Sequence, residues 1–202
     1  QTYLDIAGRK GITPDAARTH VRTNNTIIAA IAVRRGDADA MICGLEGRFR
    51  SRLQIIRDII GLADGVTELA AMTLMITNKG AFFLADTHVN EEPNLHQIVD
   101  IALRAATEVK RFGIAPKIAL VSHSDFGSHD SISARKMREA ARLIAQLAPD
   151  LEVDGEMQAD SALSDVVRGR VLPDSRLTGV ANILIMPDLD AANIANELTK
   201  VI

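Results

Sequence analysis

The chain has 202 residues, of which 47% are hydrophobic, 24% charged and 3% aromatic, and its formal net charge is −3. These fractions are typical of a globular protein and exclude disordered, collagen-like and disulfide-scaffold classes. The mild acidity and the scarcity of aromatic rings argue against a nucleic-acid partner, which needs a basic surface or stacking side chains. No apolar run approaches the ~18 residues that cross a bilayer, and the single cysteine, Cys43, has no internal disulfide partner. We therefore expect no membrane segment and a reducing cytoplasm as its surroundings.

Predicted helices occupy most of the first 60 residues. One helix begins at Thr13, which can cap it, and ends at Gly36 after two arginines in its last turn. Residues 38–43 are short and mostly apolar, which predicts a buried strand whose Cys43 is a small core residue. Residues 48–60 then predict a basic amphipathic helix.

The rest of the chain alternates strand-like and helical segments. Two apolar runs, 68–77 and 81–86, flank the short polar connection Asn78-Lys79-Gly80, which predicts a β-hairpin. The later predicted elements are helix 94–112, strand 117–121, helix 133–147, strand 151–154, helix 161–170, strand 181–186 and a helix beginning near Ala191. Strand and helix alternate from Ala38 onward, with the hairpin as the one interruption. The sequence therefore predicts an α/β fold with a mostly parallel sheet sandwiched by helices.

Polar residues follow strand 117–121, where the carboxyl end of a parallel strand would place a ligand site. The loop contains Ser122, Ser124, Gly127 and Ser128, and a helix begins just after it. Free N–H groups at a helix start favour an anion, and a glycine lets the backbone approach a ligand. The alternative interpretation is ordinary N-capping on a solvated loop.

Carboxylates stand at the ends of the other predicted strands. Asp86 and His88 would face one side of a continuing strand, as a metal pair does, but no third ligand stands at a suitable spacing. A hydrogen-bond network around Asn90 is therefore the preferred interpretation. Residues 154–156 and Asp188 are expected to cap the helices that follow them.

Arginines gather at the start of the predicted helix 48–60. Arg48 and Arg52 share one face, and Arg50 lies roughly opposite. Because arginine binds phosphate in a bidentate manner, this helix start would suit a phosphorylated ligand; a solvated helix face is the alternative. The chain contains no glycine-rich dinucleotide loop, Walker loop, Gly-x-Ser-x-Gly or Cys-x-x-Cys pattern.

Taken together, the segments at the strand ends resemble those of the phosphotransacetylase (phosphate acetyl/butyryltransferase) family. The matching segments are 35–41, 86–90, Ser122-His123-Ser124 with Gly127-Ser128, 136–140, 149–151, 154–162, 175–179, 187–189 and 192–194. They occur in the family's order from about residue 20 to the end of the chain. Residues 13–25, 57–62, 122–128 and 134–140 are most similar to the C-terminal phosphotransacetylase-like domain of hybrid NADP-dependent malic enzymes.

The resemblance implies a phosphotransacetylase- and isocitrate-dehydrogenase-like architecture with two subdomains. Residues 1–56 would end a first, incomplete subdomain, residues 57–190 would form the second, and residues 191–202 would return toward the first. The chain begins at Gln1 and stops inside a predicted helix, so we expect a fragment of a longer protein.

The resemblance also implies a regulatory role. In hybrid malic enzymes one module decarboxylates malate oxidatively, and the phosphotransacetylase-like module binds acetyl-CoA, regulates the first and builds the oligomer. The expected partners are thus acetyl-CoA or CoA, an N-terminal malic enzyme module on the same polypeptide, and further copies of the chain. No cofactor or metal is expected in this chain itself, since NADP and Mg or Mn would belong to the malic enzyme module.

The resemblance places the ligand in an interdomain cleft. The expected lining residues are Arg50, Asn90, Ser122, Ser124, Gly127, Ser128, Asp188 and Asn193. Arg50 would pair with phosphate, the serine loop would donate hydroxyl and backbone groups, and Asn193 would supply an amide.

Two departures from the family pattern argue against catalysis. The loop 44–50 is shorter than its family counterpart and contains Glu46. The family's Ser-Arg pair and downstream Asp, which position and deprotonate the CoA thiol, would lie beyond Ile202. We therefore expect no catalytic residue, with an active phosphate acetyltransferase as the alternative and a ligand-free dimerisation module as a third possibility.

Overall fold

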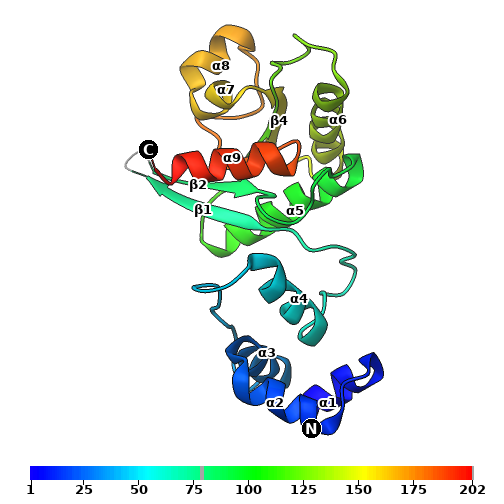
Figure 1. The fold of residues 1–202 in the computed structure, drawn as a ribbon. Helices are drawn as coiled ribbons and strands as arrows, with labels where there is room; N and C mark the ends of the chain where they lie inside the picture. The colour runs from blue at the N-terminus through cyan, green and yellow to red at the C-terminus, as the bar shows by residue number, and fades with distance from the viewer. Residues whose placement is uncertain (78–79, 202) are drawn as a thin grey trace. The chain divides into compact units, whose positions relative to one another are not determined.

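The computed structural model describes residues 1–77 and 80–201, which form two compact units, Gln1–Glu68 and Leu69–Ile202 (Figure 1). The first unit is helical. Its elements are α1 (Thr2–Ala7), a short 3-10 turn η1 (Gly8–Lys10), α2 (Pro14–Thr23), α3 (Asn25–Arg35) and α4 (Phe49–Ile59). The expected subdomain boundaries at residues 56 and 190 stay predictions.

Asn24 divides the single helix that was predicted between Thr13 and Gly36 into α2 and α3. Its backbone is extended, and its side-chain oxygen accepts hydrogen bonds from the N–H groups of Thr26 (3.0 Å) and Ile27 (3.3 Å). A short amide side chain competes in this way with the helical backbone, so the asparagine starts a new helix instead of continuing the old one.

The prediction of a buried strand over residues 38–43 is wrong. These residues form no strand, Ile42 is fully exposed, and Cys43 is exposed rather than part of a core. A strand needs a hydrogen-bonded neighbour, and the first unit contains no other strand to supply one. Alternation of strand and helix therefore begins at Met72 and not at Ala38.

The second unit is built on one five-stranded sheet. Its strands are β1 (Met72–Thr77), β2 (Gly80–Ala85), β3 (Lys117–Val121), β4 (Glu152–Met157) and β5 (Ile183–Ile185), in the order β1-β2-β5-β3-β4. The β1–β2 pair is the predicted antiparallel hairpin, and the other three pairs are parallel, which confirms a mostly parallel sheet. Asn78 and Lys79 of the predicted turn lie outside the described residues.

Among the described residues of this unit, five helices surround the sheet: α5 (Leu95–Arg111), α6 (Ile132–Leu147), α7 (Ala159–Leu163), α8 (Asp165–Val171) and α9 (Leu189–Thr199). The helix predicted over residues 161–170 is divided into α7 and α8 at Ser164. The Ser164 backbone is extended, and its hydroxyl accepts from the N–H of Val167 at 3.3 Å, so it caps α8.

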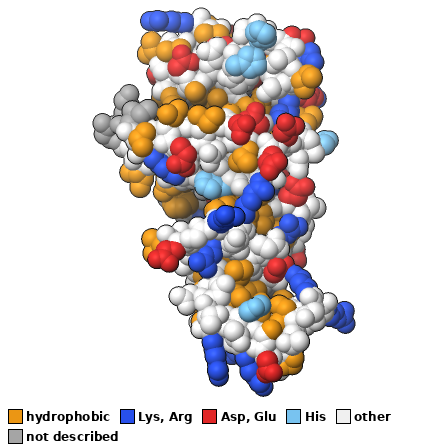
Figure 2. Space-filling model, viewed as in Figure 1, with side chains coloured by type: hydrophobic (Ala, Val, Ile, Leu, Met, Phe, Trp, Pro, Cys, Tyr) orange, Lys and Arg blue, Asp and Glu red, His pale blue; other side chains and the backbone are white. Residues whose placement is uncertain are grey.

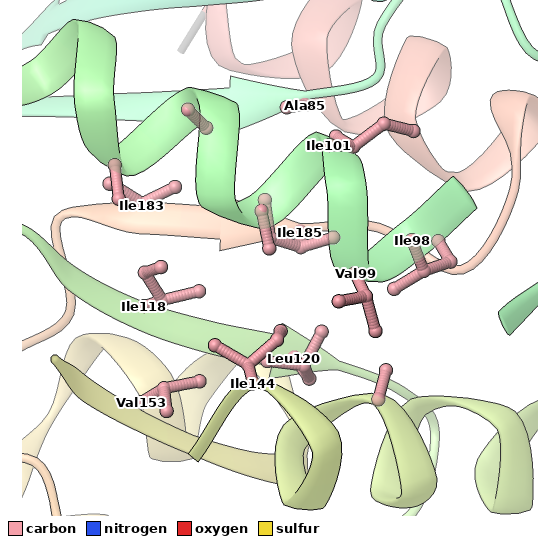
Figure 3. Close-up of a cluster of buried hydrophobic side chains, with 14 of the residues drawn as sticks. Ala85, Ile98, Val99, Ile101, Ile118, Leu120, Ile144, Val153, Ile183 and Ile185 are labelled. Atoms are coloured by element: carbon pink, nitrogen blue, oxygen red, sulfur yellow. The ribbon is translucent and has the colours of Figure 1, made fainter. Parts of the chain in front are cut away.

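Two apolar clusters cover opposite faces of the sheet, because side chains alternate along a strand. Ile118 and Leu120 of β3 point toward α5 and α6 (Figure 3), whereas Ala119 belongs to the cluster that includes Ala162 of α7 and Ala192 of α9. Helices therefore cover both faces, as predicted.

Gly155 of β4 provides a direct test of how tightly the sheet is packed. Its φ is +138°, and an added Cβ would lie 2.7 Å from the Leu120 carbonyl oxygen. We expect Gly155→Ala to lower the free energy of unfolding of the second unit by more than about 2 kcal/mol, because both the backbone conformation and the contact are unfavourable. Urea unfolding followed by circular dichroism measures this change.

Gly169 of α8 supplies the matched control, since a Cβ there meets nothing within 4 Å. Gly169→Ala should be neutral or stabilising by up to about 1 kcal/mol, because alanine is the better helix former. Equal effects of the two substitutions would contradict the packing described for Gly155.

Candidate functional site

The predicted site residues of the second unit lie on loops at the carboxyl ends of its parallel strands, except for Asn193, which lies in α9. Asn90 follows β2, the serine loop follows β3, and Asp188 and Asn193 follow β5. The loops that follow parallel strands lie along the same end of a sheet. The residues that the sequence predicted as a site therefore share this rim of the sheet.

The serine loop after β3 is folded around the carboxylate of Glu156. Ser124 is 0% exposed and donates its hydroxyl hydrogen to Glu156 Oε1 at 2.8 Å, and the Gly127 N–H donates to the same oxygen at 2.9 Å. The Phe126 N–H donates to the Glu156 carbonyl oxygen at 2.8 Å. The loop thus encloses an internal anion.

Arg138 of α6 completes the shell around Glu156. Its Nε donates to Oε2 at 2.8 Å and its Nη2 to Oε1 at 2.9 Å, while Nη2 also donates to the His129 carbonyl oxygen at 3.1 Å. Burial raises the pKa of Glu156. The hydrogen bonds from Arg138, Ser124 and Gly127 lower it by a larger amount, so the pKa lies below its usual value. Glu156, 0% exposed, is therefore a buried carboxylate that stays ionised.

The loop's own backbone donors are used inside the protein. The Ser124 N–H donates to Ser122 Oγ (3.3 Å), the Asp125 N–H to Ser128 Oγ (3.0 Å) and the His129 N–H to Ser124 Oγ (3.0 Å). The sequence led us to expect that backbone N–H groups of this loop donate to a ligand. At these three positions, such donation would require the internal hydrogen bonds to break. In the loop formed by residues 122–131, the exposed side chains include those of His123, Ser128, His129 and Asp130.

Asp86 organises the loop after β2. Its carboxylate accepts from the N–H groups of Ala71 (3.0 Å), His88 (3.1 Å) and Asn90 (3.0 Å) and also from the Asn90 amide. The Asn90 Nδ2 donates in addition to the Leu69 carbonyl oxygen at 2.9 Å. The predicted hydrogen-bond network around Asn90 is therefore confirmed.

The loop after β5 begins α9. Asp188 caps this helix, as predicted, by accepting from the Ala191 N–H at 2.8 Å. Asn193 lies one turn further on, with its Nδ2 3.5 Å from the Thr87 carbonyl oxygen. The loop that carries Asn90 and the part of α9 that carries Asn193 are thus neighbours.

Acidic side chains surround this helix start. A hollow of about 430 Å³ is lined by Glu91, Glu92, Asp188, Leu189 and Asp190. Figure 2 shows acidic side chains gathered on this part of the viewed face, near the beginning of α9. Carboxylates repel phosphate, so this hollow does not suit the phosphate groups of a nucleotide.

Arg50 lies in the first turn of α4 in the first unit and is exposed. Its neighbour Arg52 has a role within that unit, since its Nη1 donates to Thr26 Oγ1 at 2.7 Å and its Nε to the Glu46 carbonyl oxygen at 3.3 Å. Arg52 is therefore engaged in packing α4 against α3.

Glu156, Arg138 and Lys136 organise this site but were not identified as site residues from the sequence. The prediction that Glu156 caps a helix is wrong: Gln158 occupies the cap position of α7, and Glu156 is the buried carboxylate described above. Arg138 and Lys136 of α6 were noted only as part of a motif. Their positions in the segments shared with the family were the available signal.

The described residues support neither a metal site nor a membrane-spanning helix. Within residues 1–77 and 80–201, no group of three or more His, Cys, Asp or Glu side chains could hold a metal ion. The same residues contain no helix of the length and apolar character that spanning a membrane requires.

Comparison with known proteins gives a consistent family assignment. The family model described as phosphate acetyl/butaryl transferase matches residues 1–202. An NAD-dependent malic enzyme of Rhizobium meliloti (strain 1021) is 54% identical over 170 residues, 84% of this chain and 22% of that enzyme. An NADP-dependent malic enzyme of Escherichia coli (strain K12) is 45% identical over 166 residues, 82% of this chain and 22% of that enzyme.

Solved structures agree with this assignment. A phosphotransacetylase from Streptococcus pyogenes superposes with a TM-score of 0.84 at 30% identity, over 99% of this chain and 61% of that chain. The α/β fold predicted from the sequence is therefore confirmed by a related structure. The chain spans only about a fifth of the length of the two malic enzymes.

The buried Glu156 carboxylate makes stability depend on pH in a defined direction. Because its pKa is lowered in the folded state, the unfolded chain binds the proton more readily, and the stabilisation is lost as the pH falls from the ordinary glutamate pKa to the lowered one. Glu156→Gln removes this charge. We expect the variant to be less stable than the wild type by about 1–3 kcal/mol at pH 7, and the difference to shrink between pH 5 and pH 3.

Thermal unfolding at a series of pH values measures this difference. Glu46→Gln changes an exposed carboxylate of the first unit and should leave stability nearly unchanged throughout. A Glu156→Gln deficit that is constant with pH would show that the carboxylate charge is not what stabilises the loop.

Proposed function

Since the chain belongs to the phosphate acetyl/butaryl transferase family, we propose that it is a phosphotransacetylase-like regulatory domain of a malic enzyme. In this proposal it binds acetyl-CoA or CoA as an allosteric effector and contributes to a homo-oligomer. The observation that carries the proposal is the greater sequence identity to malic enzymes than to the phosphotransacetylase of known structure. The malic enzyme module would lie on the same polypeptide and decarboxylate malate.

The geometry of the serine loop favours binding over catalysis. Ser124 is buried and its hydroxyl is already bound to Glu156, so it is not placed to attack a ligand. Glu156 itself has a lowered pKa and an arginine partner, and a carboxylate of that kind is a weak general base. What the loop offers is a pre-organised surface, and pre-organisation reduces the entropy cost of binding.

The cofactors of the proposed parent enzyme are assigned to its other module. NADP with Mg or Mn would serve the oxidative decarboxylation there; of the two malic enzymes compared, one uses NAD by name and the other NADP. If acetyl-CoA changes malate or coenzyme affinity, those ligands must change acetyl-CoA affinity by the same factor, since coupling is reciprocal.

An active phosphate acetyltransferase is the second candidate, and the similarity to a phosphotransacetylase structure favours it. The two candidates differ in turnover. Formation of acetyl-CoA from acetyl phosphate and CoA by the full-length protein would establish the acetyltransferase and overturn a purely regulatory domain.

Arg50 provides a test of ligand binding. We expect Arg50→Gln to weaken acetyl-CoA binding to the full-length protein about tenfold or more, because a charge-assisted hydrogen bond to phosphate is lost. Isothermal titration calorimetry measures the dissociation constant directly.

Arg57→Gln is the matched control, since Arg57 is an exposed arginine of the same helix. It should bind acetyl-CoA as the wild type does. No heat of binding for wild-type protein at millimolar acetyl-CoA would overturn the effector proposal, whereas equal affinity of Arg50→Gln and wild type would remove only the role of Arg50.

A further inference from the structure

Lys136 of α6 joins two loops that are far apart in the sequence. Its Nζ donates to the Pro93 carbonyl oxygen at 2.8 Å and to the Pro187 carbonyl oxygen at 2.7 Å. Each carbonyl directly precedes a helix cap, Asn94 for α5 and Asp188 for α9. One ammonium group therefore holds the beginnings of two helices.

The position of Lys136 on α6 explains how it reaches this point. Met137 is fully buried and faces the apolar core, so Lys136 and Arg138 project from opposite flanks of the helix. Long side chains of a helix lean toward its N-terminus. Because α6 begins at the carboxyl end of β3, both cations extend toward the rim that carries the predicted site residues.

The pKa of Lys136 is lowered, because its burial outweighs the nearby carboxylates. Burial lowers the pKa of Lys136, and the nearby charges of Asp188 and Glu92 raise it in part. A partly buried ammonium that makes two hydrogen bonds to carbonyl groups satisfies acceptors that an apolar side chain would leave unpaired.

We propose that Lys136 is a positioning residue that holds the loop after β2 against the loop after β5. This holds Asn90, on the first loop, near Asn193, on the helix that the second loop begins. Other bonds connect the same loops, among them the one from the Leu189 N–H to the Glu91 carbonyl oxygen at 3.0 Å, so loss of Lys136 should loosen the loops without unfolding the domain. The consequence for acetyl-CoA binding rests on the proposed function; the holding of the loops does not.

Hydrogen–deuterium exchange of the full-length protein tests the proposal. In Lys136→Met we expect the amides of Leu189 and Ala191 to exchange at least about tenfold faster than in the wild type. Lys136→Arg, which keeps several donors, should restore slow exchange. Lys110→Met, which removes an exposed lysine near the end of α5, is the control and should leave these amides unchanged.

The ligand measurement separates positioning from a purely structural role. We expect acetyl-CoA affinity to fall at least about fivefold in Lys136→Met and to recover in Lys136→Arg. The circular dichroism spectra of both variants should equal that of the wild type, which shows that they are folded. Unchanged exchange in Lys136→Met overturns the proposal that Lys136 holds the loops. Faster exchange with unchanged affinity overturns its positioning role in acetyl-CoA binding.

If the wild type binds no acetyl-CoA, the proposed function fails and the exchange data alone decide whether Lys136 holds the loops. If Lys136→Met does not fold, Lys136→Gln, which keeps one amide donor, takes its place in both measurements with the same expected direction.

Discussion

The buried carboxylate of Glu156 is the interaction on which the rim of the sheet depends. An ionised group with no exposed surface is unfavourable unless donors surround it, and here Arg138, the Ser124 hydroxyl and the Gly127 N–H do so. These donors come from α6 and from the loop after β3, while the carboxylate comes from β4. Each part would lose its partner if another moved, so charge satisfaction fixes the loop conformation together with the packing of Phe126 against an apolar cluster.

Helix α6 carries this organisation across the rest of the rim. Arg138 on one flank reaches the ends of β3 and β4, and Lys136 on the other reaches the loops after β2 and β5. Met137 between them anchors the helix to the core. A single helical turn thereby contacts the loops after β2, β3 and β5 and the carboxyl end of β4. This arrangement suits a preformed binding surface, because little of it must become ordered when a ligand arrives.

Local sequence patterns predicted most of the second unit because its elements satisfy local rules. The hairpin, the strand 117–121 and the long amphipathic helices follow from side-chain periodicity, and Asp188 and the network around Asn90 follow from capping and loop chemistry. The failures have a different physical origin. Residues 38–43 have the composition of a strand, but a strand depends on a neighbour that the first unit does not contain. Asn24 and Ser164 end one helix and begin another through side-chain caps, which periodicity does not detect.

The centre of the candidate site was beyond local reasoning. Glu156 lies 32 positions from Ser124 and 18 from Arg138, and only the pairing of β3 with β4 brings them together. The resemblance to the family identified the three segments that contain these residues but not the hydrogen bonds that connect them. The double-mutant cycle of Glu156→Gln and Arg138→Met, followed by chemical unfolding at pH 7, tests this joint role most directly. We expect the double variant to be no less stable than Arg138→Met alone, because an unpaired buried carboxylate is then absent. Losses of stability that simply add would show that the two groups act independently and would contradict the account.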